Sequence, residues 1–439
     1  MFNSIEKIYD YTEHPVNLKK ELEEQGIIAE DLSRNEKYER KFSPESEKQY
    51  DLLSSIIDKE WEKFKSEASQ DKLLNRYLNL KKSRNSSEDK SADIEKAITD
   101  QIQSYGDETE QYQKLEETTY QQLEIESGLK SFDAIRCAKD RVRTLAFLET
   151  IKEKVKTGDK ILEAGAGTGI LAIAAAQAGA EVAALEINPI TAIFARRVVE
   201  RCIAEGLIKK GQVKIMLGDA LKYKRTSQDE KDGKKFDGFI SENLYTGQFY
   251  ELQMQISNYL LKYIDIEQDK IIPKGMVNGV ELTTLPAGVI DRFPEGKTDF
   301  VAKDLYNPNK AKGITAPEAY DYIDFRKEES VGVRNRIVKT IAQDGVIDSA
   351  TIFSLIQLSG REPSGRKGNI IHRGEADFLN NDHVIMLNRS LNVIKGDQIE
   401  IYISYIAGDR PSQADIRIKN LRTNEEASNI KEVKIREAA

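Results

Sequence analysis

The stretch Glu163-Ala164-Gly165-Ala166-Gly167-Thr168-Gly169 decides the fold. It follows the short apolar run 160–162 and precedes residues 170–178, which have the composition of a helix. Glycines at a strand-to-helix turn let the backbone pass close to a ligand, and open parallel sheets bind ligands at the carboxyl ends of their strands. A dinucleotide fingerprint needs its third glycine at the position of Ile170, one residue later than here. The turn therefore predicts a ligand that has no pyrophosphate.

Alternating strands and helices follow this turn. The sequence predicts further strands at 182–185, 213–217 and 236–241, with a helix that begins at Asn188-Pro189. Proline is common in the first turn of a helix. This β-α-β order predicts a mostly parallel sheet covered by helices, a Rossmann-like α/β fold.

Two acids follow successive predicted strands. Glu186 ends the second strand and can accept hydrogen bonds from both hydroxyls of a ribose, and Asp219 after the third strand can accept from an adenine amino group. With the glycine turn, this set resembles class I S-adenosylmethionine-dependent methyltransferases. The resemblance implies S-adenosylmethionine as cofactor, bound in part by four residues of the turn: Glu163, Gly165, Gly167 and Gly169. The alternative is a nucleotide-like fold in which these residues are only structural.

A pair of glutamates, Glu242 and Glu251, brackets a loop with aromatic residues and a glycine after the fourth predicted strand. This nine-residue spacing resembles the protein arginine methyltransferase family. Residues 139–144 resemble the family's helix before the nucleotide fold, which puts Arg143 where the family's arginine meets the cofactor carboxylate. His383 falls at the family's Thr-His-Trp position. The resemblance covers about residues 125 to 420 and implies an arginine N-methyltransferase with Glu242, Glu251 and His383 as catalytic residues.

The chemistry of the acceptor explains why two carboxylates are needed. A guanidinium is always charged near neutral pH, so its nitrogens are poor nucleophiles. Two carboxylates can hold it by charge-assisted bonds and draw its positive charge away from the reacting nitrogen. They also offset the repulsion between a sulfonium and a guanidinium, which is about 4 kcal/mol at about 4 Å and an effective dielectric of about 20.

Some family positions differ here. The family's Tyr-Phe-x-x-Tyr helix would fall at 124–128, its Trp-Met pair is Asn243-Leu244, and the residue after His383 is Val384. The methyl acceptor and the product, monomethyl or either dimethyl form, therefore stay open. The family's dimerisation arm would fall at about 300 to 326, where the sequence predicts no long helix. A homodimer stays open for the same reason.

Two other functions compete with arginine methylation. One is a methyltransferase for lysine, another amine or RNA, and the other is a non-catalytic scaffold that retains the fold. RNA is disfavoured because residues from 121 onward carry 47 basic and 46 acidic side chains, without the concentrated basic patch that phosphates require. The expected acceptor is thus an arginine-containing protein, a peptide or a small guanidine.

The flanking regions predict the domain organisation. Strict alternation at 399–404 and 415–418 predicts an antiparallel β-barrel or sandwich. Residues 1–120 carry 19 basic and 28 acidic side chains, and apolar residues recur there at helical spacing between 50 and 80. We therefore expect an acidic helical extension at 1–120 with a linker at 81–91, a cofactor-binding Rossmann-like domain at 121–273, and a β-barrel substrate domain at 274–439.

Composition limits the cellular setting. The two cysteines, Cys137 and Cys202, cannot form a disulfide framework, and no Cys/His cluster has the spacing of a metal site. The first residues lack the apolar core of a signal peptide, and every long apolar stretch is interrupted by glycine or charge. A cytoplasmic protein without membrane spans or metal ligands is expected.

Overall fold

The structure is a computed structural model that describes residues 14–33, 40–67, 130–224, 235–263, 270–285, 299–301, 312–360, 369–376 and 381–429. The chain divides into two compact units. The Rossmann-like unit comprises Lys41–Glu242 and Lys262–Ile272, and the barrel unit comprises Met1–Arg40, Asn243–Leu261 and Pro273–Ala439. The domain boundaries at 120 and 273 stay predictions. The expected linker at 81–91 and the positions 124–128 lie outside the described residues.

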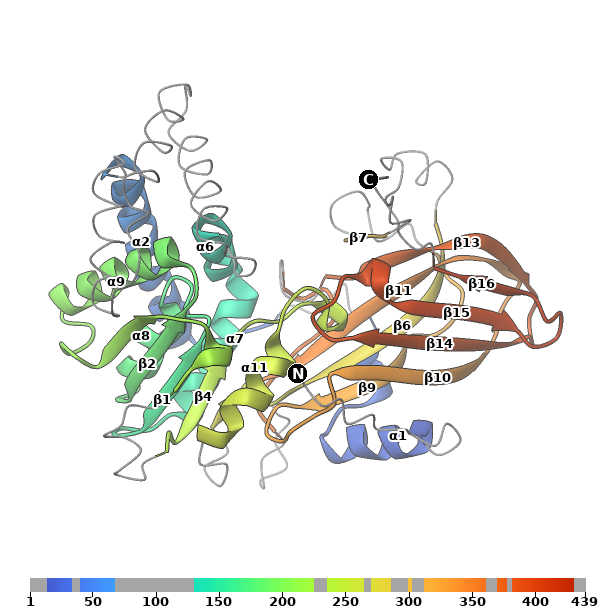
Figure 1. Ribbon diagram of the computed structural model, residues 1–439, viewed down its shortest axis with the longest axis horizontal. Coiled ribbons are helices and arrows are strands. Elements are labelled where there is room, and N and C mark those ends of the chain that lie inside the picture. Colours follow the sequence, from blue (N-terminus) through green and yellow to red (C-terminus); the bar gives the residue numbers. More distant parts are fainter. Residues whose placement is uncertain are drawn as a thin grey trace, which may run out of the picture. The chain divides into compact units, whose positions relative to one another are not determined.

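A parallel sheet with strand order β3-β2-β1-β4-β5 forms the centre of the Rossmann-like unit (Figure 1). The order reverses at β1, whose neighbours are β2 and β4, and ligands bind at such a switch point. The strands are β1 (Lys160–Ala164), β2 (Glu181–Glu186), β3 (Val213–Leu217), β4 (Gly238–Ser241) and β5 (Ile271–Ile272). The parallel sheet and the order of its strands confirm the predicted fold.

Helices join and cover these strands. They are α6 (Ser131–Lys139), α7 (Arg141–Lys154), α8 (Ile170–Gln177), α9 (Pro189–Ala204) and the short helix η2 (Ala220–Lys222). The side chain of Asn188 caps α9 by accepting hydrogen bonds from the N–H groups of Ile190 and Thr191, at 2.9 and 3.4 Å. Proline at the first position of α9 completes a favourable helix start.

The predicted amphipathic N-terminal helix is present as α2 (Pro44–Glu67). The apolar side chains of one helix face, which include Leu53 and Ile57, are buried. On the same face Trp61 and Phe64 both contact the ring of Phe194 on α9, with ring centroids 5.6 and 5.4 Å apart. Residues 68–80 lie outside the described residues. Helix α2 therefore forms part of the Rossmann-like unit through an aromatic contact.

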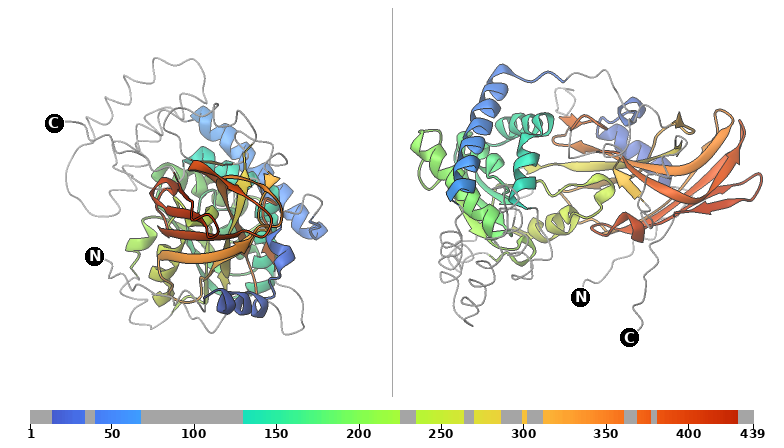
Figure 2. Two further views of the ribbon diagram at one scale, coloured as in Figure 1. Left: turned by 90° about the vertical axis from the view of Figure 1, so that its right-hand side faces the viewer. Right: turned by 90° about the horizontal axis from the view of Figure 1, so that it is seen from above.

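The barrel unit consists of antiparallel strands (Figure 2). One sheet has the order β7-β13-β11-β6-β8, with β12 beside β11 and β9 beside β6, and the other has the order β10-β14-β15-β16. The strands are β6 (Gly275–Thr284), β7 (Asp299–Val301), β8 (Lys312–Gly313), β9 (Glu318–Asp324), β10 (Gly332–Thr340), β11 (Gly345–Gln357), β12 (Ile370–Ile371), β13 (His383–Val393), β14 (Gln398–Ile406), β15 (Asp415–Asn420) and β16 (Glu426–Ser428).

Side chains from both sheets share one apolar core, as alternation at 399–404 and 415–418 predicted. Ile352 of β11, Ile401 of β14 and Ile416 of β15 are members of this core. The remaining helices of the unit are α1 (His14–Glu24), η1 (Ala29–Leu32), η3 (Thr246–Gln248), α11 (Gln253–Leu260) and η8 (Pro411–Gln413). Leu18 and Leu22 of α1 pack against the sheet around Val277, so the N-terminal segment belongs to the barrel unit.

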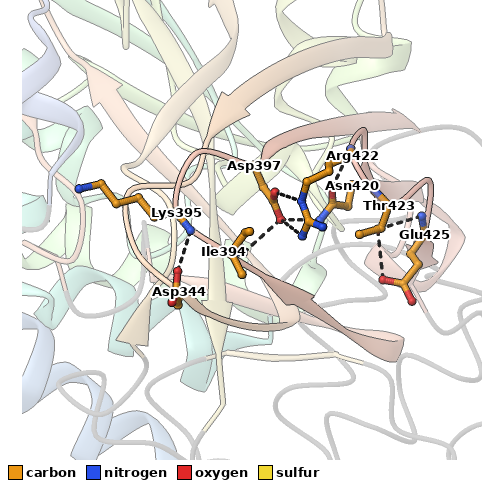
Figure 3. A network of polar contacts seen from close by, with 8 residues as sticks. All are labelled: Asp344, Ile394, Lys395, Asp397, Asn420, Arg422, Thr423 and Glu425. Atoms are coloured by element: carbon orange, nitrogen blue, oxygen red, sulfur yellow. Dashed lines mark hydrogen bonds and ion pairs between the residues drawn. The ribbon is translucent and has the colours of Figure 1, made fainter.

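A polar network ties together two turns of the barrel (Figure 3). Asp397 accepts hydrogen bonds from the guanidinium of Arg422 and from Asn420 Nδ2, the latter at 2.8 Å. It also accepts from the backbone N–H of Ile394 at 3.1 Å. Arg422 in particular lowers the pKa of Asp397, because it stabilises the carboxylate form. This network joins the β13–β14 turn to the β15–β16 turn.

We expect the variant Phe64→Ala to lower the free energy of unfolding by about 3 kcal/mol, because it leaves a cavity between α2 and α9. Trp61 is the only tryptophan of the chain, so its fluorescence reports on this contact during urea denaturation. Leu52→Ala is the matched control, since Leu52 lies on the same helix with 39% of its surface exposed and should change the stability by less than about 0.5 kcal/mol. Equal stability of the two variants would contradict the packing described.

Candidate active site

The glycine turn follows β1, and its three glycines adopt left-handed backbone angles. The φ angles of Gly165, Gly167 and Gly169 are +79°, +54° and +82°, a region that side chains with a Cβ rarely enter. The N–H groups of Gly165 and Ala166 both donate to Leu185 O at 2.9 Å. The turn is thereby anchored to the end of β2, and α8 begins directly after Gly169.

Glu186 holds the same turn from its side chain. Its Oε2 accepts a hydrogen bond from the N–H of Gly167 and its Oε1 accepts one from the N–H of Asn188, both at 2.8 Å. The residue is buried. A carboxylate oxygen can accept more than one hydrogen bond, so Glu186 can still receive the hydroxyls of a ribose.

Glu163 on β1 is buried without a charge partner among the described residues. It is 1% exposed, and neither carboxylate oxygen makes a hydrogen bond within the described ranges. Burial raises its pKa well above the ordinary value, and the nearby charge of Glu186 raises it further. The backbone N–H of Ala172 lowers the pKa of Glu163 by a smaller amount, although it is not placed to form a hydrogen bond with the carboxyl group. A cationic ligand group beside Glu163 would favour its ionised form, so this position suits such a group.

Asp219 follows β3 and caps the short helix η2. Its Oδ1 accepts a hydrogen bond from the N–H of Leu221 at 2.9 Å, and its Oδ2 lies 3.2 Å from Lys222 Nζ. One quarter of its side chain is exposed. Asp219 therefore already has a structural task, and an adenine amino group would use its remaining acceptor capacity.

Arg143 and Glu242 form an ion pair within the Rossmann-like unit. Their side chains are 7% and 9% exposed, and Nη2 of Arg143 contacts Oε2 of Glu242. Nη1 of Arg143 donates to the carbonyl oxygen of Cys137 at 2.7 Å, while its Nε has no hydrogen-bond partner among the described residues. The sequence patterns did not predict this pair, because 99 residues separate its two members.

The loop between the two glutamates continues into the barrel unit, where its residues bond to the strands. Thr246 Oγ1 donates to Asn381 O at 2.6 Å, and the N–H of Gly247 donates to Ser354 Oγ at 2.9 Å. The ring of Phe249 is fully buried in the barrel core. Glu251 ends this loop, its N–H donates to Phe249 O at 2.7 Å, and burial raises the pKa of its carboxyl.

His383 begins β13 and lies beside this loop. Its ring centroid is 6.0 Å from that of Tyr245 and 5.9 Å from that of Phe249. The preceding residue, Asp382, forms a two-point ion pair with Arg373, with both distances at 2.8 Å. Within the barrel unit, His383 and the loop that carries Glu251 are therefore held together by ring contacts.

The candidate residues thus fall into two groups. The Rossmann-like unit holds the glycine turn, the acids Glu163, Glu186 and Asp219, and the Arg143–Glu242 pair. The barrel unit holds Glu251 and His383.

Thr168 is a further candidate that the sequence motifs did not single out. It is buried, and its Oγ1 has no hydrogen-bond partner within the described ranges. Its position between Gly167 and Gly169 in the sequence could have indicated that it faces the ligand.

Two kinds of feature are absent from the described residues. None of the helices there combines the length and the apolar character that crossing a membrane requires. Nor does that part of the chain bring together three or more His, Cys, Asp or Glu side chains in a group suited to a metal ion.

Comparisons with known proteins give a consistent picture. Residues 142–238 match the family model described as ribosomal protein L11 methyltransferase (PrmA). An uncharacterised protein of Methanocaldococcus jannaschii is 24% identical over 270 residues, which are 61% of this chain and 90% of that protein.

Two solved structures share the fold. The PRMT1 enzyme-prozyme heterotetrameric complex of Trypanosoma brucei with AdoHcy is similar with a TM-score of 0.53 and 16% identity, over 66% of this chain and 95% of that one. Protein arginine methyltransferase 10 of Arabidopsis thaliana is similar with a TM-score of 0.50 and 17% identity, over 66% of this chain and 93% of that one.

These matches agree with the geometry. The chain has a class I S-adenosylmethionine-dependent methyltransferase core. This core is combined with a barrel domain, as in the two similar arginine methyltransferase structures. S-adenosylmethionine is its cofactor. The residues present fit this molecule, because the left-handed glycine turn admits close approach and the buried Glu163 can pair with an ammonium group.

We expect Glu163→Gln to be more stable than the wild type near pH 7. In the unfolded chain Glu163 ionises around its ordinary pKa of 4.5, whereas burial keeps it protonated to a higher pH in the folded chain. The folded state then binds more protons, so the stability of the wild type falls as pH rises above that value. Glutamine avoids this loss, so the variant should unfold at a higher urea concentration than the wild type near pH 7.

Urea denaturation near pH 7 and near pH 4 measures the effect. The difference should shrink at the lower pH, where Glu163 is protonated in both states. Glu181→Gln is the control, because Glu181 lies exposed at the other end of a neighbouring strand. A gain that is larger near pH 4 than near pH 7 would refute the assignment.

Proposed function

We propose that this S-adenosylmethionine-dependent methyltransferase acts on the guanidinium of an arginine in a protein or peptide, or of a small guanidine. The observation that carries the proposal is the buried contact between Glu242 and the guanidinium of Arg143. A carboxylate directly after β4, at the ligand-binding end of the sheet, is already in a position to bind this chemical group. Glu251, nine residues later, would supply the second carboxylate.

The cofactor would be held by residues of the Rossmann-like unit. Glu186 would accept from the ribose hydroxyls, Asp219 from the adenine amino group, and Glu163 would pair with the ammonium group. Arg143 has donors left for the cofactor carboxylate, since one guanidinium carries five N–H bonds and its Nε is without a partner in the described ranges. Arg143 could therefore bind that carboxylate while it keeps its contact with Glu242.

We expect a single displacement, for which bound S-adenosylmethionine would supply an electrophilic methyl group. A guanidinium nitrogen of the acceptor would receive this methyl group, with S-adenosylhomocysteine as the leaving product and one proton released. Glu242 and Glu251 would draw positive charge toward the nitrogens that they bind, leaving the third nitrogen more nucleophilic. His383 would take up the proton or keep the loop of Glu251 in place.

Because Glu251 is buried, its ionised form needs a nearby cation to stabilise it. Its raised pKa means that burial disfavours the carboxylate form, the form that can balance a cation. An incoming guanidinium favours the ionised form, so binding of the acceptor and ionisation of Glu251 assist each other. A neutral acceptor would not provide this stabilisation, which supports a cationic substrate class.

The comparisons support a protein acceptor. The matched family model is named for methylation of a ribosomal protein, and both similar structures are protein arginine methyltransferases by name. A lysine or another amine of a protein is the second candidate, because the matched family is named for a protein substrate without stating which group is methylated. The Trypanosoma structure is an assembly of several chains, so we also propose self-association of this chain, which light scattering can measure.

The function is tested with wild-type enzyme, labelled S-adenosylmethionine, and two synthetic peptides that differ only by lysine in place of one arginine. We expect methylation of the arginine peptide, located by mass spectrometry, and none of the lysine peptide. Glu251→Gln should lower the rate at least about a hundredfold, because it removes transition-state charge stabilisation, while the cofactor affinity changes by less than about threefold.

Glu328→Gln serves as the control for this variant, since Glu328 is an exposed residue of the same unit. Methylation of only the lysine peptide would replace arginine with an amine as the acceptor. Full activity of Glu251→Gln would exclude the two-carboxylate mechanism.

The cofactor assignment gives a separate prediction. Glu186→Gln should weaken S-adenosylmethionine binding about 10- to 100-fold, as expected for the loss of hydrogen bonds to a charged acceptor. Calorimetric titration measures this affinity. Glu181→Gln, at the opposite end of the same strand, should bind as the wild type does. An unchanged affinity of Glu186→Gln would contradict the ribose contact.

A further inference from the structure

The loop before Glu251 contains two residues with unusual backbone conformations. Gln248 and Tyr250 have φ angles of 60° and 61°, and among the described residues other than glycine only Asn424 shares this region, with φ 61°. Asparagine enters it readily, whereas a bulky tyrosine does so at an energetic cost. Such conformations persist only where the surroundings impose them, and they concentrate at functional sites.

The turn after β14 imposes the conformation. Gln248 O accepts a hydrogen bond from the N–H of Gly408 at 2.7 Å, and the N–H of Tyr250 donates to Asp409 O at 3.1 Å. Gly408 is itself left-handed, and a Cβ there would come within 2.7 Å of Leu252 Cδ2. Both strained residues are thus fixed by backbone bonds from one neighbouring turn.

This conformation separates the aromatic side chains of the loop. Phe249 points into the barrel core and is fully buried, with its ring centroid 4.9 Å from that of Tyr405. Tyr250, the residue next to Glu251, is 45% exposed. Its ring meets the ring of Tyr245 at a centroid distance of 5.1 Å and an interplanar angle of 78°. The strain therefore holds a large aromatic ring at the surface instead of burying it.

We propose that Tyr250, supported by Tyr245, is a specificity-determining residue whose ring stacks on the planar cation of the acceptor. The inference rests on the proposed function and names the residue that selects its substrate. A guanidinium is planar and weakly hydrated, and it stacks on aromatic faces. An exposed tyrosine beside the buried acid that would bind this cation supplies such a face. A strained exposed ring has little value for stability, so recognition explains its place better than packing.

The test compares glycine substitutions at two sites with the same φ angle. Tyr250→Gly and Asn424→Gly both remove a side chain from a left-handed position, so neither should lower the melting temperature. Only Tyr250→Gly should raise KM for the arginine peptide, by about tenfold. Its kcat should stay within about twofold, and its affinity for S-adenosylmethionine should not change.

Two further substitutions separate the ring from its bulk. Tyr250→Phe retains the aromatic face, so KM should stay within about twofold of the wild type. Tyr250→Leu keeps an apolar side chain of similar size without that face, and KM should rise as in Tyr250→Gly. A packing role would instead separate the two variants, with KM of Tyr250→Leu near the wild type and only Tyr250→Gly impaired.

The possible results separate a failure of the proposed function from a failure of the role assigned to Tyr250. Absence of transfer from wild-type enzyme to the arginine peptide overturns the proposed function, and the inference that rests on it fails with it. If the wild type is active and Tyr250→Gly has an unchanged KM, only the inference is overturned. A fall in kcat, cofactor affinity or melting temperature without a rise in KM assigns Tyr250 a structural role and also overturns it.

Discussion

The two hydrogen bonds accepted by Glu186 are the contact on which the cofactor end of the molecule depends. One comes from the N–H of Gly167 in the turn after β1, and the other from Asn188 at the start of α9. A single buried carboxylate thus joins the first strand's turn, the end of the second strand and the following helix. Charge-assisted bonds of this kind are stronger than neutral ones, and they keep the turn open while glycines supply its left-handed backbone.

Buried acids beside this contact suit a cationic ligand. The Rossmann-like unit buries Glu163 and Glu186 next to the turn, and the carboxyl group of Glu163 makes no hydrogen bond within the described residues. The only buried arginine of the candidate set, Arg143, pairs with Glu242 instead. S-adenosylmethionine carries an ammonium and a sulfonium against one carboxylate, so its net charge complements this excess of acids.

Much of the fold could be predicted from the sequence because it depends on local patterns. Period-two alternation predicted the barrel strands, the glycine turn with Asn188-Pro189 predicted the β-α-β order, and helical spacing predicted α2. The long-range contacts could not be predicted in this way. The Arg143–Glu242 pair and the packing of α1 on the barrel join distant segments, and no periodicity records them.

The conformation of the glutamate loop shows a second limit of sequence patterns. Left-handed backbone at Gln248 and Tyr250 has no compositional signal, because glycine or asparagine is the expected residue at such positions. It results from the turn that contains Gly408, about 160 residues downstream.

A strained tyrosine in this loop is a departure from the rules that stabilise a fold, and so is a buried glutamate on β1 that has no hydrogen-bond partner in the described part of the chain. Stability alone would favour glycine at Tyr250 and an uncharged side chain at Glu163. Both departures lie in segments that the sequence motifs single out, namely the end of β1 with its glycine turn and the loop after β4. Local rules are broken in natural proteins mainly where function requires it. The coincidence of strain, a buried acid and sequence motifs therefore argues that these two segments are retained for binding and catalysis, at a cost that the aromatic and apolar cores of the two units offset.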